Sequence, residues 1–313
     1  MKKKRKLKKL PIIIIIAILL IIIGTIVAIK YTQKINSNEY KLGELGYNEK
    51  DISTITKLKQ EEIDIILNKD YKSVIPKLIK EKYFLFKNLD SYLEYFNENN
   101  DEDLDYIIAI VNVKSNYDHY DEDIVISSDT EKQNLLLVNK YTKLNSDYVP
   151  ENLTNIPLTL SFEGNQTTKE VLSAFKSMWT AAKKEGLTLI VNSSYRDYQS
   201  QEEVWNNYEN AYGEEYADSI AARPGFSEHQ TGLALDIITY GANKNTFDTT
   251  DEFKWLEKNA HKYGFILRYP KDKEDITGYA YESWHYRYVG KTAASEIKNL
   301  NITFDEYYAF YKD

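Results

Sequence analysis

The chain has 313 residues, of which 42% are hydrophobic and 28% are charged, so it can bury the core of one large domain or of two modest ones. It contains no cysteine, which excludes disulfides, thiol catalysis and cysteine-ligated zinc. The net charge is −8, but residues 1–9 hold seven Lys and Arg and no acidic residue, which leaves 33 basic and 48 acidic residues, or −15, for the remainder. This acidic remainder predicts no affinity for nucleic acid, because that affinity depends largely on Lys and Arg that neutralise phosphates.

Residues 1–9 form a basic tail, and residues 10–29 contain no charged side chain. A helix of twenty residues is about 30 Å long, which matches the hydrocarbon core of a bilayer. We therefore predict a cytoplasmic tail at 1–9 and a single transmembrane anchor at 10–29, with the remainder extracytoplasmic, because basic flanks stay in the cytoplasm. A cleaved signal peptide is the less favoured alternative, since its apolar region usually has about 7–15 residues and ends in a small-residue cleavage site that this sequence lacks.

The segment after the anchor is polar at residues 30–47, without sustained periodicity, and is predicted to be a stalk. From Asn48, a plausible N-cap, apolar residues recur at roughly helical spacing and predict a small helical module next to the membrane at 48–125. We find no catalytic motif in this module. The apolar stretches at 106–113 and 135–138 are predicted to be strands.

The later part of the chain, residues 130–313, shows clear signals for the ends of helices. Thr167 and Glu170 form a capping box that opens a helix, and Gly186 ends it. Further strands are predicted at 187–191, 233–238, 265–269 and 284–289, and further helices at 197–211 and 249–263. Because helices and strands alternate irregularly, we predict an α+β fold with a small, mostly antiparallel sheet flanked by helices.

Two short stretches, residues 227–236 and 282–285, contain most of the candidate chemistry. They include two of the four histidines, His229 and His285, together with Asp236. A turn after His229 would bring it toward Asp236, and a catalytic zinc usually has three protein ligands and one open position. Each residue alone is more often structural, in a loop, a cap or an aromatic cluster. Together they favour a metal site.

These stretches also resemble the signature of a known family. The pattern Ser-x-His-x-x-Gly-x-Ala-x-Asp at 227–236, followed by Glu-x-x-His at 282–285, is similar to that of the VanY-like D-alanyl-D-alanine carboxypeptidases, zinc peptidases of the bacterial cell wall. Residues 194–201 and 284–290 resemble two further elements of that family, and the resemblance covers about residues 130–300. One departure is Ser283, where many relatives have proline, but it removes no catalytic group.

The resemblance implies roles for individual residues. One Zn²⁺ per catalytic domain would have three protein ligands, a glutamate would activate a zinc-bound water, and an arginine would hold the terminal carboxylate or the oxyanion. The implied metal ligands are His229, Asp236 and His285, the catalytic base is Glu282, and the substrate contacts are Arg196, Gln201 and Ser227.

The implied function is a zinc-dependent D,D-carboxypeptidase that trims the terminal D-alanine of peptidoglycan stem peptides on the wall side of the cell membrane. An L,D-carboxypeptidase acting on tetrapeptide stems is an alternative, because the metal-site motifs do not distinguish the two. A third possibility is a non-catalytic zinc-fold protein for wall binding or signalling. Glu282 argues against it, since a structural zinc site needs no general base.

Overall fold

The computed structural model describes residues 9–311, and the chain divides into two compact units, one ending at Asn97 and one beginning at Glu98. Residues 1–8, which make up most of the predicted basic tail, lie outside the described residues. Helices dominate the first unit, and the four-stranded sheet lies in the second.

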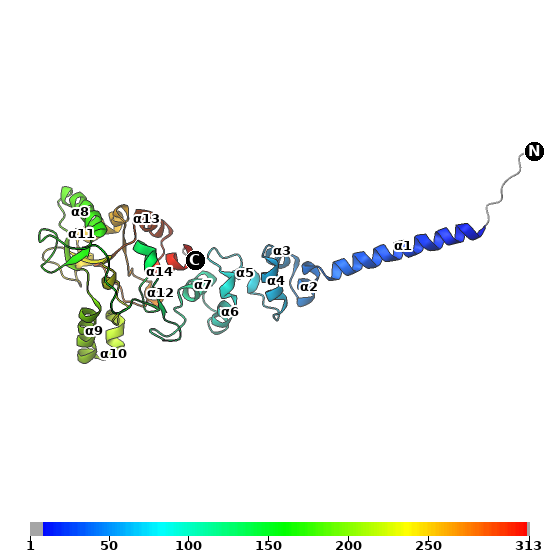
Figure 1. The fold of residues 1–313 in the computed structure, drawn as a ribbon, viewed down its shortest axis with the longest axis horizontal. Coiled ribbons are helices and arrows are strands. Elements are labelled where there is room, and N and C mark those ends of the chain that lie inside the picture. Colours follow the sequence, from blue (N-terminus) through cyan, green and yellow to red (C-terminus); the bar gives the residue numbers. More distant parts are fainter. Residues whose placement is uncertain (1–8, 312–313) are drawn as a thin grey trace, which may run out of the picture. The chain divides into compact units, whose positions relative to one another are not determined.

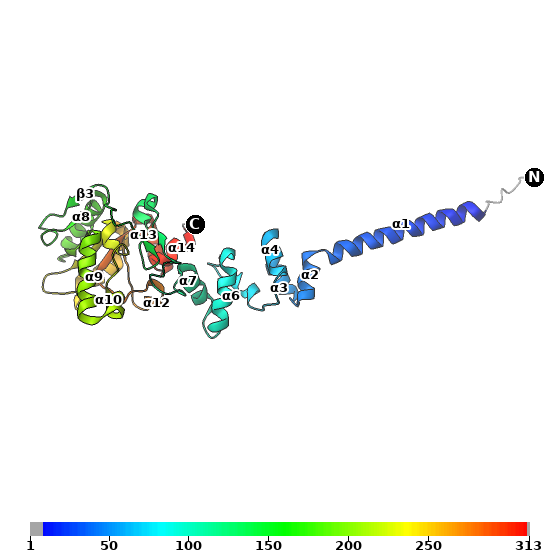
Figure 2. The same cartoon turned by 60° about the horizontal axis from the view of Figure 1, so that its bottom comes forward.

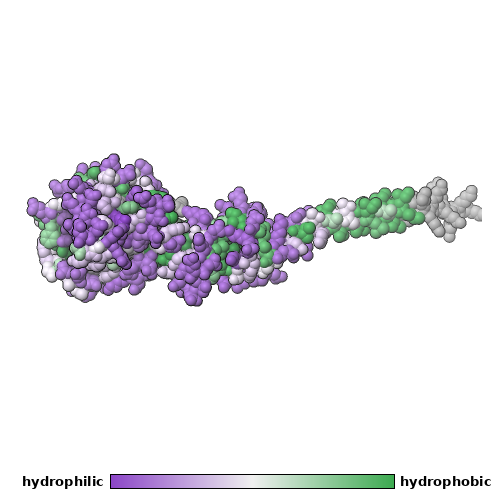
Figure 3. Space-filling view, turned by 90° about the horizontal axis from the view of Figure 1, so that it is seen from below, coloured by the Kyte–Doolittle hydropathy of each residue, from purple (hydrophilic) through white to green (hydrophobic). Residues whose placement is uncertain are grey.

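The first unit begins with the long helix α1 (Lys9–Ile35) (Figure 1). The most apolar 18-residue window of its segment Ile13–Ile35 has a mean hydropathy of 3.1, and none of that window is buried, so the segment is long and apolar enough to cross a membrane. Figure 3 shows the surface of this helix as largely apolar. Such a helix near the amino terminus is compatible with a membrane anchor and with a signal sequence.

Short helices follow in the first unit. They are α2 (Asn38–Leu45), α3 (Glu49–Ile55), α4 (Gln60–Leu67), α5 (Ile75–Leu78), the 3-10 turn η1 (Phe86–Asn88) and α6 (Leu89–Glu98). Asn48 is confirmed as an N-cap, because its side chain accepts a hydrogen bond from the Asp51 backbone N–H at 3.1 Å. Residues 30–47, expected to form a stalk, contain the end of α1 and all of α2.

The strand predicted at 106–113 is wrong, because these residues form the helix α7 (Leu104–Val113). The helix is apolar around most of its circumference, and Ile107, Ile108 and Ile110 are all buried. A short apolar run cannot be assigned to a strand or to a buried helix from its periodicity alone. Here tertiary burial overrides the preference of β-branched residues for strands.

The strand predicted at 135–138 is also wrong. Leu135 ends the 3-10 helix η2 (Thr130–Leu135), and residues 136–138 are irregular. The Arg287 guanidinium donates to the carbonyl oxygens of Leu136 at 2.6 Å and of Asn134 at 3.2 Å. A buried side chain, and not a neighbouring strand, therefore satisfies this backbone.

The central sheet of the second unit has the order β5 (Ile190–Ser193), β6 (Ala234–Ile238), β8 (His285–Tyr288) and β7 (Phe265–Leu267), with every neighbouring pair antiparallel. This confirms the predicted small, mostly antiparallel sheet, although each strand is shorter than expected or shifted by a few residues. Two smaller pairs accompany it, the parallel β1 (Ile126–Ser127) with β2 (Thr142–Lys143) and the antiparallel β3 (Leu153–Asn155) with β4 (Gln166–Thr168).

Helices and 3-10 turns surround the sheet. They are α8 (Lys169–Lys184), α9 (Tyr198–Tyr212), α10 (Glu214–Ile220), η3 (Glu228–Thr231), η4 (Phe247–Thr249), α11 (Asp251–Asn259), η5 (Ala260–Tyr263), α12 (Glu274–Thr277), α13 (Lys291–Leu300) and α14 (Phe304–Tyr311). Figure 1 shows α8 and α11 on one side of the sheet and the α9–α10 pair on the other, and Figure 2 shows α9 and α10 side by side.

The N-cap of α8 lies one residue after the predicted position, and the N-cap of α11 lies one residue after the predicted start of that helix. Thr168 accepts from the Val171 N–H, and Thr250 accepts from the Phe253 N–H. The hydroxyl of Thr167, the predicted cap, instead donates to the Gly232 carbonyl at 2.7 Å. In the sequence, two adjacent threonines are equivalent candidates for an N-cap. In α8, the hydrogen bond of Thr167 to the distant Gly232 carbonyl leaves Thr168 as the cap.

Strand alternation divides the sheet into two faces with different roles. Leu235 and Tyr286 are register partners and belong to the main hydrophobic core, which includes residues of α8 and α11. Asp236 and His285 are the next register pair, so their side chains lie on the opposite face. The packed core thus holds the strands that present Asp236 and His285 to the other side.

Candidate metal centre

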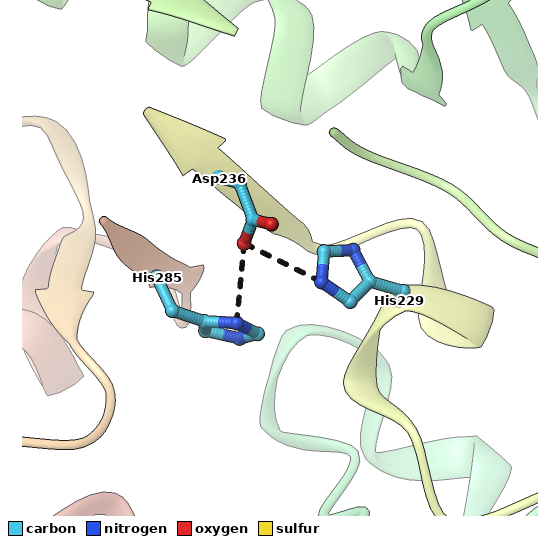
Figure 4. A group of neighbouring side chains, drawn as sticks. All are labelled: His229, Asp236 and His285. Carbon is cyan, nitrogen blue, oxygen red and sulfur yellow. Dashed lines mark ion pairs between the residues drawn. The ribbon is translucent and has the colours of Figure 1, made fainter. Parts of the chain in front are cut away.

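His229, Asp236 and His285 come together from three separate elements, η3, β6 and β8 (Figure 4). The chain turns from η3 into β6 at Gly232, which has φ of 67°. A Cβ at this glycine would approach Pro150, Leu153 and Thr168 side chains to 3.1–3.3 Å. The left-handed conformation and the crowding both favour glycine here.

The candidate donor atoms converge closely. His229 Nε2 and His285 Nδ1 each lie 3.4 Å from Asp236 Oδ1, and donor atoms of the three residues all lie within 4.8 Å of one another. A tetrahedral zinc with bonds of about 2.0–2.1 Å separates its ligand atoms by roughly 3.3 Å. All three residues are buried, as catalytic zinc ligands are expected to be. Their spacing therefore suits a zinc ion.

The outer nitrogen of each imidazole ring has its own partner. His229 Nδ1 lies 2.6 Å from the Ser194 carbonyl oxygen, and His285 Nε2 lies 3.3 Å from Glu228 Oε2. Each outer nitrogen must carry the proton to donate to these acceptors, which leaves the inner nitrogen with a free lone pair. Burial also lowers the pKa of His229 to about 4. Burial acts to lower the pKa of His285 as well, but its contacts with Asp236, Glu228 and Glu282 raise that pKa well above its usual range, so a metal at Nδ1 would replace a proton there. In the neutral form of each ring, the outer contact sets the tautomer that a metal requires.

Asp236 presents a buried anionic oxygen toward the two rings. Burial acts to raise its pKa, but His229, His285 and Lys244 together hold the pKa of this carboxyl well below its usual range. No described residue makes a hydrogen bond to Asp236 Oδ1, although the atom is buried. A buried charged oxygen without a hydrogen-bond partner is costly unless a cation faces it. The residues therefore fit a bound metal cation.

Glu228 is a member of this site that sequence analysis missed. Its carboxylate is fully buried and receives hydrogen bonds from Arg268 Nε and Arg287 Nη1, each at 2.8 Å. Arg268 in turn pairs with Asp305 of α14 at 2.5 Å. Burial raises the pKa of Glu228, but the two guanidinium groups outweigh it and keep the carboxylate ionised. The sequence signal that could have identified Glu228 was its position inside the motif at 227–236. The structure shows that the other residues of this motif are buried as well.

Glu282 lies beside the three candidate ligands without belonging to their group. Its Oε2 is 3.4 Å from His285 Nδ1, and its side chain is 16% exposed. Its backbone N–H donates to the Tyr269 carbonyl at 3.1 Å, which holds the segment before β8 against the end of β7. Glu282 lines the same pocket as the candidate ligands and can reach a molecule bound there.

Arg196, Gln201 and Ser227 also line this pocket. Arg196 donates to Gln201 Oε1 at 2.6 Å and to Ser193 Oγ at 3.3 Å. Gln201 Nε2 donates to the Ala222 carbonyl at 2.7 Å, so both ends of its amide are used within the protein. The Ser227 hydroxyl accepts from the His229 backbone N–H at 3.3 Å. In this structure Gln201 thus orients Arg196, and Ser227 supports the turn that carries His229.

The remaining pocket wall is largely aromatic and apolar. Besides the residues above, it contains Val204, Tyr208, Ile220, Tyr269, Tyr279 and Trp284. The side chains of Tyr208 and Val204 come from α9, opposite the sheet face that presents Asp236 and His285. Gln201 belongs to the same helix, so a molecule in the pocket would contact polar as well as apolar side chains from α9.

Comparison with known proteins agrees with this geometry. The family model of VanY, described as D-alanyl-D-alanine carboxypeptidase, matches residues 164–291. The putative carboxypeptidase YodJ of Bacillus subtilis is 45% identical over 181 residues, which are 56% of this chain and 66% of that protein. The chain thus spans just under two thirds of the length of this relative.

Two solved structures are also similar. The LdcB LD-carboxypeptidase has 42% identity and a TM-score of 0.56, and the match covers 62% of this chain and 94% of that chain. A vancomycin-resistance D,D-pentapeptidase VanY in complex with Zn(II) has 33% identity and a TM-score of 0.50, with 56% of this chain and 98% of that chain covered. With the motif residues gathered in one pocket, this chain belongs to the VanY family of D-alanyl-D-alanine carboxypeptidases.

Proposed function

We propose that this chain is a zinc-dependent D,D-carboxypeptidase that removes the terminal D-alanine of peptidoglycan stem peptides. One observation carries the proposal: two imidazole nitrogens and one carboxylate oxygen converge within 4.8 Å in a pocket that also contains Glu282 and Arg196. Family membership supplies the substrate class.

The proposed ligands of a single Zn²⁺ are His229 Nε2, Asp236 Oδ1 and His285 Nδ1. When bound, zinc supplies Lewis acidity that polarises a carbonyl and makes water more acidic. The chain's own part is to hold three donors within 4.8 Å of one another, with the carboxylate oxygen 3.4 Å from each ring nitrogen, in a pocket that a substrate could enter.

Glu282 is the proposed general base. As the base, Glu282 would accept a proton from the attacking water. As the acid in the second half of the reaction, it would donate that proton to the leaving amine. Its position supports this role, because its carboxylate is close to His285 but has an exposed edge on the pocket. A group that only stabilised the fold would not need that access.

Arg196 is the proposed contact of the substrate's terminal carboxylate. A guanidinium has five N–H donors, and the two bonds to Gln201 and Ser193 fix its plane while leaving donors for a ligand. The planar fork can grip a carboxylate with two hydrogen bonds. This contact would restrict cleavage to the last peptide bond of a chain with a free carboxyl end.

An L,D-carboxypeptidase acting on tetrapeptide stems is the second candidate. The specific observation in its favour is the 42% identity to the LdcB LD-carboxypeptidase structure. The two activities differ in the configuration of the residue before the scissile bond. The metal ligands, Glu282 and Arg196 would serve both.

The proposed location is the outer side of the cell membrane, with α1 as a single-pass anchor and residues 48–125 as a membrane-proximal module. The support is the length and apolarity of the segment Ile13–Ile35. In this arrangement the catalytic domain, residues 130–313, would face the cell wall, where its substrate is found.

The test is D-alanine release from defined pentapeptide and tetrapeptide stems by zinc-loaded protein, with and without a chelator. Release from the pentapeptide that the chelator abolishes supports the D,D activity, and release from the tetrapeptide alone supports the L,D activity. No release from either peptide would contradict both and favour a non-catalytic protein. Release that is unchanged in Glu282→Ala would contradict the role of Glu282.

A further inference from the structure

Lys244 contacts a candidate metal ligand although no motif contains it. It lies in the loop between β6 and η4, and its ammonium group donates to Asp236 Oδ2 at 2.7 Å. The same group lies 5.1 Å from the centroid of the Trp284 ring. Its side chain is 42% exposed, whereas that of Asp236 is 1% exposed. Lys244 therefore reaches from the pocket rim to a buried carboxylate.

The loop that carries Lys244 is held by local hydrogen bonds. The Asn243 backbone N–H donates to Thr246 Oγ1 at 3.1 Å, and the Asn245 N–H donates to Asn243 Oδ1 at 2.9 Å. Trp284 directly precedes His285, so the ring under the ammonium group is attached to β8. A turn on one side and an aromatic ring on the other thus orient the lysine toward Asp236.

The two oxygens of Asp236 consequently have different surroundings. Oδ1 faces His229 Nε2 and His285 Nδ1, each at 3.4 Å, and Oδ2 accepts the hydrogen bond from Lys244. A carboxylate can bind a metal through one oxygen or through both. A charge-assisted hydrogen bond to Oδ2 favours binding through Oδ1 alone, because it occupies and stabilises the second oxygen.

We propose that Lys244 is a positioning residue that keeps Asp236 a one-oxygen ligand and so leaves a coordination position of the metal open for the reactants. The inference rests on the proposed zinc site. A catalytic zinc has three protein ligands and an open position. If Asp236 bound through both oxygens, the second would occupy that position.

The test replaces zinc with Co²⁺, whose visible d–d absorption weakens as its coordination number rises above four. The variants are Lys244→Met, which keeps the apolar stem, and Lys244→Arg, which keeps the charge. Lys271→Met is the matched control, because Lys271 also pairs with a carboxylate, Asp248 at 3.7 Å, and lies over an aromatic ring, Tyr281 at 4.6 Å, but contacts no candidate ligand. Zinc affinity is measured in parallel by competition with a chromophoric chelator.

The expected result is an intense cobalt spectrum for the wild type and Lys271→Met, a weaker one for Lys244→Met, and partial recovery in Lys244→Arg. The zinc affinity of Lys244→Met should fall by on the order of 10-fold, as it does when other hydrogen-bond partners of metal ligands are removed. Identical spectra for the wild type and Lys244→Met would overturn the inference, as would a wild type that binds neither metal. The spectrum needs no substrate, so a wild type that binds cobalt but releases no D-alanine would contradict the proposed activity while the spectra still decide the role of Lys244.

Discussion

Glu228 Oε2 lies 3.3 Å from Nε2 of His285, on the opposite edge of the ring from the nitrogen that faces Asp236. This contact extends the candidate site into a buried network of charges, since Glu228 also pairs with Arg268 and Arg287. The ring of His285 thus has a carboxylate at each of its two nitrogens. Its orientation and its tautomer both depend on the outer one.

Glu228→Gln is expected to weaken zinc binding by roughly 10- to 100-fold, because the neutral amide is a poorer acceptor for the His285 N–H. It should also destabilise the fold by about 3–5 kcal/mol, since two buried guanidinium groups lose a carboxylate. Chelator competition measures the first effect and urea unfolding the second. Glu214→Gln is the control, because Glu214 pairs with Arg223 at the surface. Equal zinc affinities for Glu228→Gln and the wild type would contradict the role of Glu228.

Arg196→Ala is expected to lower kcat/KM by roughly 10- to 100-fold, which corresponds to the loss of a charged hydrogen bond worth about 1.5–3 kcal/mol. The informative comparison uses stem peptides with a free carboxyl end and the same peptides with a terminal amide. The wild type should strongly prefer the free carboxylate, and the variant should lose most of that preference. A preference that survives in Arg196→Ala would assign recognition of the carboxylate to another residue.

Zinc binding is expected to stabilise the second unit. A ligand that binds only the folded state adds about 2.7 kcal/mol at a concentration 100 times its Kd. All four tryptophans of the chain, at positions 179, 205, 255 and 284, lie in this unit, so tryptophan fluorescence reports its unfolding specifically. The unfolding midpoint should rise with added zinc in the wild type and stay constant in His229→Ala. A midpoint that does not respond to zinc in the wild type would argue against the metal site.

The N-cap of α9 predicts a pH-dependent difference in stability. Asp197 accepts a hydrogen bond from the Ser200 backbone N–H at 2.8 Å, and bonds from Ser200 lower the pKa of Asp197. A lowered pKa in the folded state means that the ionised carboxylate stabilises the fold above its unfolded-state pKa. This contribution is lost as the pH falls through the folded-state pKa.

Asp197→Ala should therefore cost about 1 kcal/mol near neutral pH, the usual value of an N-cap, and less in acid. Asp197→Asn, which can still cap the helix, should differ little from the wild type at low pH. Urea unfolding followed by tryptophan fluorescence at neutral and acidic pH measures both variants. A cost of Asp197→Ala that grows as the pH falls would show that the sign of this linkage is wrong.

The chain's local patterns correctly predicted the elements whose apolar and polar residues alternate clearly. The strand predicted at 233–238 is confirmed as β6, in which Leu235 lies in the hydrophobic core and Asp236 on the opposite face. The capping and ending signals of α8, α9 and α11 were accurate to one or a few residues. The run at 106–113 was wrongly assigned to a strand, because a short apolar run is compatible with a strand and with a buried helix. Other elements bury this helix on nearly all sides, and its own sequence does not reveal that packing.

The candidate site divides in the same way. The sequence by itself determined which residues could form the site, because residue type and spacing along the chain do not depend on the fold. These residues are His229, Asp236, Glu282 and His285. Only the tertiary structure decided their partners: Lys244 beside Asp236, and Arg268 with Asp305 behind Glu228. Arg268 and Asp305 lie 40 and 77 positions after Glu228, so their spacing in the chain does not indicate that they pair. The fold buries all three charges together, and a buried charge is costly unless an opposite charge pairs with it.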